Sequence, residues 1–464
     1  MGGERAPEGA APWSPVALTA LGAIVAQQLL VLGAVRFVLY PELIVYPYLT
    51  ASGWLPYREI LDQHFPGLLF LPVNFHTLGL RDPWDFHLLL MAVAASQTVL
   101  TYVVARRLAG EAPALLAALA YAAWQPFFEG ETLWLDTLLP LFTLPALLLL
   151  LDARWFVAGL ALGIGVLFKQ TLVPLVAFAG LVVLRECGLH GWRSVLRFAA
   201  GALLPSLATL AYLAKIGVLA DFWFWTVTFN LSTYATDGTL APRLGDVVRM
   251  ALPVAIGIAS LAVAPRRWRA PLVALWGIFS IAGGVGRFGL VHLQPAVPCF
   301  AILLGMLGVE LWQRRATIAL LVLVAITPVW LGEFYGRRAR WLDDPAAKAR
   351  LAAVEQLIRD RAAPADRVLL LGVSPELYAS TGTVPPGRVF VFPFPWFLDA
   401  AGDRVLASLR RDPPKLVLVD TGSATDGRLL RDDARPILDE VRARWVQTAR
   451  LGSIAVYEPG PGPH

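Results

Sequence analysis

The chain has 464 residues, of which 57% are hydrophobic and only 16% are charged, whereas soluble domains carry about 25% charged residues. Nearly half of the 39 basic and 34 acidic side chains lie in residues 337–464, so residues 1–336 are far more apolar than the average suggests. This composition excludes intrinsic disorder, a coiled coil and an ordinary soluble enzyme for residues 1–336. It predicts a membrane domain over 1–336 and a soluble domain over 337–464.

Apolar segments long enough to cross a bilayer as helices recur along residues 1–336. The segment 155–184 is too long for one span, and Lys169 at its middle predicts two short helices joined by a polar apex. We therefore expect a polytopic α-helical membrane protein with about eleven transmembrane helices. They are predicted at residues 16–35, 86–105, 112–127, 135–151, 155–184 (two helices), 198–214, 248–263, 271–286, 292–311 and 316–334.

Basic residues gather in alternate loops between these segments, which is the positive-inside pattern of membrane proteins. With the N-terminus inside, the arginine clusters at 106–107, 185–197, 266–269 and 314–315 all face inward. The loops at 42–81, 129–131 and 220–246 then face outward, and so does the soluble domain. We expect a multi-pass plasma (inner) membrane protein with an extracytoplasmic C-terminal domain. Because basic residues of residues 1–336 sit in short clusters between apolar segments, a nucleic-acid partner is not expected despite the net charge of +5.

Residues 337–464 are predicted to form a small α/β domain, because strand-like and helical patterns alternate there. Strands are expected at 367–372, 388–392, 415–420 and 453–457, and helices at 346–362, 403–411 and 428–445. Residues 337–464 hold neither a P-loop nor a Gly-x-Gly-x-x-Gly motif, and no nucleotide cofactor is expected. The two cysteines, Cys187 and Cys299, are too few for a disulfide framework or a cysteine metal site.

The first predicted outer loop concentrates charge beside aromatic residues. Glu42, Arg58, Glu59, Asp62 and His64 lie within about twenty-five residues. Carboxylates activate a hydroxyl nucleophile by accepting its proton, and cations stabilise a phosphate leaving group. The loop therefore suits transfer from a phosphorylated donor. An interfacial loop with aromatic anchors and solvated charges is an equally good interpretation of its composition.

Lys169 is the second candidate, because a lysine at membrane depth is costly unless it is paired or hydrated. At an outer apex it would face the same side of the membrane as the first loop. The alternative is that it extends to the lipid headgroups. The glycines at 159, 163 and 165 are expected to allow close helix packing rather than nucleotide binding.

Two further outer segments carry polar or aromatic side chains. Residues 221–234 are rich in Phe and Trp, which favours an interfacial aromatic belt over a wall for an isoprenoid chain or a sugar. The glycine-rich turn at 283–289 is followed by His292, and it presents Arg287, whose guanidinium suits a phosphate. A histidine near a helix start also has a purely structural interpretation.

Several of these segments, in their order along the chain, resemble the motifs of dolichyl-phosphate-mannose protein mannosyltransferases (glycosyltransferase family 39) and their bacterial lipopolysaccharide-modifying branch. The matching segments are Glu42 after the first span, Leu55-Pro-Tyr-Arg58, Asp62-Gln-His64-Phe-Pro66, Arg106-Arg107-Leu-Ala-Gly110, Phe168-Lys-Gln-Thr171, Asp221-Phe-Trp223 and His292-Leu-Gln294. The resemblance implies a C-type glycosyltransferase fold. It also implies transfer of a sugar, a hexose or a pentose, from a polyprenyl-phosphate-linked donor to a lipid, glycan or protein acceptor on the outer face.

The resemblance also implies roles for individual residues. Glu42 or Asp62 would be the catalytic base, and the choice stays open because Pro41 replaces the usual Asp before Glu42. The donor phosphate would be bound by Lys169, His64, Arg58 and Arg287. The substrates would further contact Asp136, Gln170, His292 and Gln294. Asp136 at a helix start is explained equally well by the helix dipole. Outer carboxylates suit a divalent cation, but no ligand spacing assigns one.

Two other functions remain open from sequence. A transporter or lipid flippase predicts charges along a midplane path and two similar halves, and neither pattern is visible. A structural assembly subunit would tolerate replacement of Glu42, Asp62 and Lys169. Transfer chemistry instead requires these three side chains to serve one outward cavity.

Overall fold

The computed structural model describes residues 13–460 except 189–190, 264–268, 285, 320–321, 323–326, 328, 330, 333 and 336–344. The chain divides by its internal contacts into two compact units. The first unit comprises Met1–Val38, His87–Ser206 and Leu240–Leu342. The second unit comprises Leu39–Phe86, Leu207–Thr239 and Asp343–His464. A division by packing therefore places the first predicted outer loop and residues 207–239 in one unit with the C-terminal domain, whereas the prediction divided the chain once, after residue 336.

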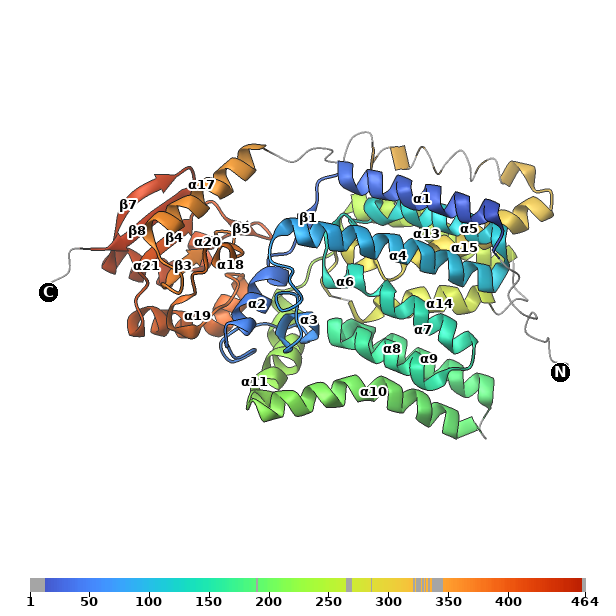
Figure 1. The fold of residues 1–464 in the computed structure, drawn as a ribbon, viewed down its shortest axis with the longest axis horizontal. Coiled ribbons are helices and arrows are strands. Elements are labelled where there is room, and N and C mark those ends of the chain that lie inside the picture. The colour runs from blue at the N-terminus through green and yellow to red at the C-terminus, as the bar shows by residue number, and fades with distance from the viewer. Residues whose placement is uncertain are drawn as a thin grey trace. The chain divides into compact units, whose positions relative to one another are not determined.

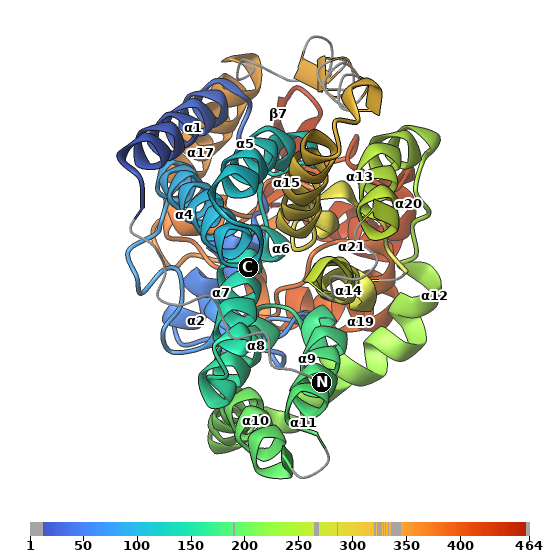
Figure 2. The ribbon, with the colours of Figure 1, turned by 90° about the vertical axis from the view of Figure 1, so that its right-hand side faces the viewer.

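The first unit is a bundle of helices whose axes run in similar directions, seen along their length in Figure 1 and nearly end-on in Figure 2. Each of the first ten predicted spans coincides with one of these helices or a close pair. About half of the eleventh, at 316–334, falls outside the described residues. The helices are α1 (Pro15–Ala34), α4 (Pro83–Ala109), α5 (Glu111–Phe127), α6 (Leu135–Leu138), α7 (Pro140–Leu151), α8 (Trp155–Phe168), α9 (Val173–Cys187), α10 (Trp192–Lys215), α13 (Leu244–Val263), α14 (Arg269–Ile281) and α15 (Val297–Gln313).

The bundle has the surface of a multi-pass membrane protein. Five helices in the described part of the chain are long and apolar enough to cross a bilayer (α1, α4, Gln170–Cys187, α10 and α13), and four shorter apolar helices accompany them. Large aliphatic side chains on these helices, such as Leu30, Leu181 and Ile258, are more than 60% exposed. Such outward-facing apolar side chains are expected where lipid replaces water as the solvent.

Helices α8 and α10 approach each other closely at two glycines of α8. A Cβ atom at Gly159 would collide with the backbone of Phe198, and one at Gly163 would collide with the backbone of Ala202. Because only glycine permits this backbone approach, the predicted packing role of these glycines is confirmed.

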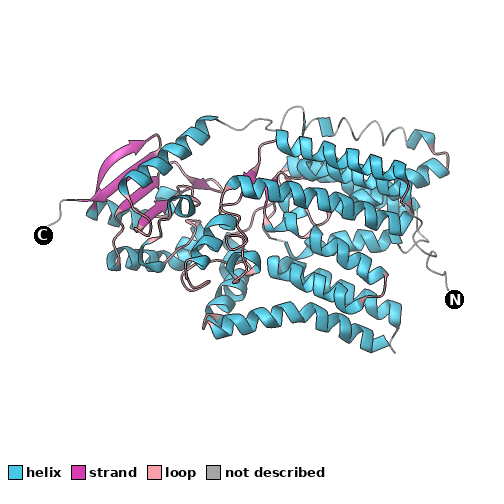
Figure 3. Ribbon diagram, viewed as in Figure 1, coloured by secondary structure: helices cyan, strands magenta, loops and turns pink. Residues whose placement is uncertain are grey.

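The second unit contains a four-stranded sheet, which Figure 3 shows in magenta. The strand order is β3 (Val368–Leu371), β4 (Leu416–Asp420), β8 (Ile454–Pro459) and β7 (Trp445–Leu451). β3 pairs with β4 in parallel, and the other two pairings are antiparallel. The helices of this domain are α17 (Pro345–Arg361), α18 (Leu377–Thr381), α19 (Pro395–Arg411), α20 (Leu430–Asp433) and α21 (Arg435–Arg444). A small C-terminal α/β domain is therefore confirmed.

Two predicted elements of this domain differ from the structure. Residues 388–392 are not a strand: Pro386–Arg388 form a 3-10 turn, and Phe390 makes an isolated bridge with Ile60 of the first loop. Prolines on both sides of this segment remove the N–H groups that a sheet ladder needs. The helix predicted over 428–445 is shorter, because Trp445 instead begins strand β7.

Both loop segments of the second unit contain short helices. The first contains α2 (Glu42–Ala51) and α3 (Gly67–Phe70), and the second contains α11 (Leu219–Trp223), π-helical turns over Phe224–Thr228 and Asn230–Tyr234, and α12 (Ala235–Asp237). Phe229 stacks on Phe397 of α19 at a ring distance of 5.4 Å, whereas Trp223 and Phe224 are exposed. One face of this aromatic segment therefore belongs to the protein core, and the other has the exposure of an interfacial belt.

Candidate active site

The charged side chains that the sequence singled out form two clusters, one in each unit. We call the group around Glu42 and Asp62 in the second unit the acidic cluster. We call the group of Asp136, Lys169 and His292 in the first unit the lysine cluster. Each cluster is complete within its own unit.

Glu42, the first residue of α2, is the least compensated member of the acidic cluster. Its side chain is 6% exposed, and its Oε2 has no hydrogen-bond partner among the described residues. Burial raises the pKa of Glu42 to about 8, and the negative charges of Asp62 and Glu376 add to this effect. A carboxyl group with a pKa near neutrality and an unoccupied oxygen has the properties of a general base.

Asp62 is held by several hydrogen bonds. Its Oδ2 accepts a bond of 2.6 Å from the Tyr46 hydroxyl, and its Oδ1 accepts one of 2.7 Å from the His64 backbone N–H. The Nδ1 of His64 also lies 2.8 Å from Oδ1. Both oxygens of Asp62 are therefore engaged, and the side chain is only 1% exposed. Of the two carboxylates left open as the base, Glu42 is the one that keeps an oxygen without a hydrogen bond to the described residues.

The three residues of the lysine cluster lie at or near helix ends in the first unit. Lys169 stands in extended backbone between α8 and a 3-10 turn (Gln170–Leu172), which confirms the predicted break between two short helices. Its Nζ donates to Asp136 Oδ2, in the first turn of α6, and lies 3.1 Å from His292 Nδ1. His292 Nδ1 is also 2.8 Å from Asp136 Oδ2. Lys169 is 8% exposed, so it forms a buried ion pair and does not extend to the headgroups.

A polar contact inside the bundle fixes the segment that carries Asp136. Gln97 Nε2 of α4 donates a bond of 2.6 Å to the Thr137 carbonyl, and the Tyr121 hydroxyl of α5 donates to Gln97 Oε1. Gln97, Tyr121 and Thr137 are all fully buried. The sequence analysis did not select Gln97, although a lone glutamine in an apolar span was a usable signal.

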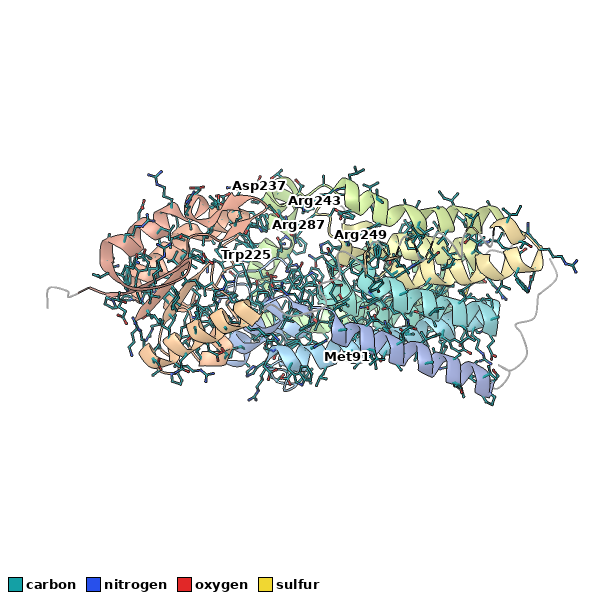
Figure 4. All side chains as sticks on the ribbon, turned by 90° about the horizontal axis from the view of Figure 1, so that it is seen from above. Met91, Trp225, Asp237, Arg243, Arg249 and Arg287 are labelled. Atoms are coloured by element: carbon teal, nitrogen blue, oxygen red, sulfur yellow. The ribbon has the colours of Figure 1, made fainter. Side chains whose placement is uncertain are left out.

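The two arginines predicted to bind phosphate, Arg58 and Arg287, lie in different units. In the second unit, Arg58 donates to Asp221 at 3.0 and 2.8 Å and to the Gly217 carbonyl at 2.5 Å, so its guanidinium links two loops. In the first unit, Arg287, labelled in Figure 4, pairs through its backbone with Leu240. It is half-buried.

The two predicted glutamines also belong to the first unit. Gln170 follows Lys169 directly and is half-buried. Gln294 is fully buried, and its Nε2 donates to the carbonyls of Gln125 and Phe128 at 3.0 and 2.8 Å. Those carbonyls lie at the end of α5, so the nitrogen of Gln294 caps that helix.

Glu376 is the acidic residue that the sequence analysis missed. It directly precedes α18, which packs against α2, and its charge acts on Glu42. More than 330 residues separate it from Glu42 along the chain, so no sequence pattern links the two. The described residues contain no group of three or more His, Cys, Asp or Glu side chains arranged to hold a metal ion. The candidate divalent cation therefore has no ligand set in this part of the chain.

The comparisons with known proteins agree with this architecture at the level of the fold. No protein-family model matches the sequence, and no curated protein matches it. The apo structure of ArnT from Cupriavidus metallidurans superposes with a TM-score of 0.61 at 15% identity, covering 96% of this chain and 99% of ArnT. ArnT bound to undecaprenyl phosphate gives 0.60 with the same identity and coverage.

A second group of structures comes from an archaeal enzyme. The oligosaccharyltransferase AglB from Archaeoglobus fulgidus, in complex with an inhibitory peptide and a dolichol-phosphate, superposes with a TM-score of 0.53 at 11% identity. The match covers 96% of this chain and 74% of AglB. The chain has the C-type glycosyltransferase fold. The fold implied by the motif resemblance is therefore confirmed, and the residue roles remain predictions.

Proposed function

We propose that the protein is a glycosyltransferase that moves a sugar, a hexose or a pentose, from a polyprenyl-phosphate donor to an acceptor hydroxyl at the outer face of the plasma membrane. The observation that carries the proposal is the buried Glu42 carboxyl, with its unoccupied Oε2 and its pKa near 8, on the fold of enzymes whose structures hold undecaprenyl phosphate or dolichol-phosphate. A donor anchored in lipid also suits an enzyme facing a compartment without nucleotide sugars.

The reaction is a single displacement at the anomeric carbon. Glu42 accepts the proton of the acceptor hydroxyl as its oxygen forms the new glycosidic bond, and the bond from the anomeric carbon to the phosphate oxygen breaks. Polyprenyl phosphate leaves with both bonding electrons, so its charge increases from about −1 to −2 as a phosphodiester becomes a monoester. Asp62, held by Tyr46 and His64, keeps the loop around Glu42 negative and ordered.

Lys169 is proposed to bind the donor phosphate. Its charge is balanced by Asp136 without donor, and a phosphate that approaches Nζ adds a second anionic partner. The stabilisation grows as charge develops on the leaving group, which is the property that accelerates the reaction. His292 and Asp136 orient the Lys169 ammonium. Gln170, next to Lys169, and Gln294, two residues after His292, are proposed as further substrate contacts. His64, Arg58 and Arg287 are proposed as further phosphate contacts.

The outer location of the site is supported by the first unit. Asp136, Lys169 and His292 come from three segments that the alternation of basic loops predicted on the outer side or at an outer apex, and they meet at one end of the bundle. Val38, where the first outer loop begins, donates a bond of 3.2 Å to the Glu131 carbonyl in another predicted outer loop. All these contacts lie within the first unit, and they support one common side for its predicted outer segments.

The proposal is tested with purified protein, radiolabelled polyprenyl-phosphate sugars and candidate acceptors. Glu42→Gln is expected to lower transfer by about 10²- to 10⁴-fold, because a positioned general base contributes that much. Lys169→Ala is expected to lower it at least about 10²-fold. Asp62→Asn is expected to have a smaller effect, because Asp62 positions rather than reacts.

Matched controls are exposed residues of the same types, Glu186→Gln and Lys215→Ala, and both are expected to retain wild-type transfer. Undiminished transfer in Glu42→Gln and Lys169→Ala would contradict the assigned roles. Movement of labelled polyprenyl phosphate across liposomes without any sugar transfer would instead support the flippase alternative.

A further inference from the structure

One arginine of the soluble domain makes several bonds to the first loop. Arg388 Nε donates to Glu59 Oε1 at 2.6 Å, and its Nη2 donates to Glu59 Oε2 and to the Gly53 carbonyl, both at 2.7 Å. The guanidinium also lies over the Trp54 ring at 5.3 Å. A planar guanidinium makes such a paired and stacked contact, whereas a lysine cannot.

The backbone beside Arg388 pairs with the same loop. The Phe390 N–H donates to the Glu59 carbonyl at 2.8 Å, and the Leu61 N–H donates to the Phe390 carbonyl at 2.9 Å. Ile60 and Phe390 thus form a parallel bridge between segments more than 300 residues apart. Leu61 is the residue immediately before Asp62, so this pairing fixes the backbone from which Asp62 projects.

The turn that presents Arg388 is strained. Arg388 has φ 52° and Gly387 has φ 60°, both in the left-handed region that a non-glycine residue rarely adopts. A Cβ atom at Gly387 would collide with Ser408, and the Gly387 carbonyl accepts a bond of 2.6 Å from Arg411. Such strain persists where the surrounding structure holds a functional geometry.

Aromatic packing extends the contact to the acidic cluster. The Tyr46 ring packs edge-on against Phe390 and Phe392 at centroid distances of 6.0 and 5.7 Å. Its hydroxyl donates to Asp62. Burial alone would raise the pKa of Glu59, but the bonds from Arg388 and from the Leu55 N–H lower it below its usual value, so Glu59 is a stable anionic partner.

We propose that Arg388 is a positioning residue for the reaction: through Glu59 and the Ile60–Phe390 bridge, it holds the loop of Glu42 and Asp62 in its working conformation. The soluble domain is then a structural part of the active site. This inference rests on the proposed function for its effect on transfer. The effect of Arg388 on the conformation of this loop is measurable without any substrate.

The first measurement is hydrogen–deuterium exchange of the full-length protein in detergent, followed on peptides covering residues 55–64. Arg388→Ala is expected to raise the exchange rate of this loop about tenfold or more while β4 and α19 keep wild-type protection. Arg410→Ala is the matched control, because Arg410 makes a similar two-bond pair with Glu440 in the same domain. It is expected to leave the loop unchanged.

The second measurement separates kcat from KM in the transfer assay. Arg388→Ala is expected to lower kcat about 10- to 100-fold with little change in KM, because a misplaced base affects the transition state. The kcat of Arg388→Lys is expected to lie between those of the wild type and Arg388→Ala. The double variant Glu59→Arg with Arg388→Glu is expected to recover part of the loss of kcat. If residues 55–64 of Arg388→Ala exchange hydrogen at the wild-type rate, Arg388 does not hold the loop. Faster exchange with unchanged kcat would overturn its role in the reaction, whereas absence of transfer in the wild type would refute only the proposed function.

Discussion

The two clusters of charged residues offset the free-energy cost of burying a charge in opposite ways. In the lysine cluster, opposite charges meet, so Lys169 is neutralised by Asp136 inside an apolar bundle. In the acidic cluster, Glu42 is buried near the like charges of Asp62 and Glu376, and burial, with a smaller contribution from these charges, raises its pKa to about 8, so that it is neutralised by a proton. Under the proposed function, the first arrangement would exchange one anion for another when the donor phosphate binds, and the second would accept the proton of the acceptor.

The largest expected effect tests whether the lysine cluster is internally balanced. Lys169→Met removes the cation and leaves Asp136 buried beside His292 alone, which is expected to cost about 3–5 kcal/mol of stability. The double variant Lys169→Met with Asp136→Asn is expected to recover most of this loss without recovering transfer. Thermal unfolding in detergent measures both. A single variant as stable as the wild type would show that the pair is not the balancing interaction.

The acidic cluster should show the reverse behaviour, because removing the charge of Glu42 removes the cost of burying it and its repulsion by neighbouring carboxylates. The folded pKa of Glu42, about 8, exceeds its ordinary value of 4.5, so the carboxyl stabilises the fold below pH 4.5 and loses that contribution as the pH rises to 8. Glu42→Gln keeps a neutral side chain throughout. Its stability relative to wild type is expected to grow over this range, by several kcal/mol at about 1.4 kcal/mol per pKa unit, and then level off. Glu186→Gln should show a constant difference in the same unfolding assay.

The rate of transfer should follow the same titration. Because the base must be deprotonated, wild-type kcat/KM is expected to rise about tenfold per pH unit below pH 8 and to level off above it. Glu376→Gln removes one of the charges that raise the pKa of Glu42, so the midpoint should move to lower pH. A profile that falls with rising pH would assign the base elsewhere.

The smallest expected effect concerns Tyr46. Tyr46→Phe removes the 2.6 Å bond to Asp62 and keeps the ring packed on Phe390. A bond to a charged acceptor contributes about 1.5–3 kcal/mol, so unfolding measurements should show a loss at the lower end of that range. Equal stability of the variant and the wild type would show that water replaces the hydroxyl.

Local patterns in the sequence were sufficient to predict many elements of the fold. Apolar stretches predicted the helices of the bundle, and the break at Lys169 followed from one charge inside a thirty-residue segment. The segment 388–392 was the clearest error, because its alternating apolar residues resemble a strand. Its backbone partners are Glu59 and Leu61, far away in sequence, and no local pattern encodes such a partner.

The sequence alone determined that the chain crosses a membrane, which residues are charged near its predicted outer loops, and that Lys169 needs a counter-ion. Only the tertiary structure decided that Asp136 supplies it with His292 beside the pair, that both oxygens of Asp62 are engaged while Glu42 keeps one without a hydrogen bond, and that Glu376 and Arg388 join the first loop. The physical reason is that hydropathy acts over one helix, whereas a pKa or an ion pair depends on distances between segments that folding brings together.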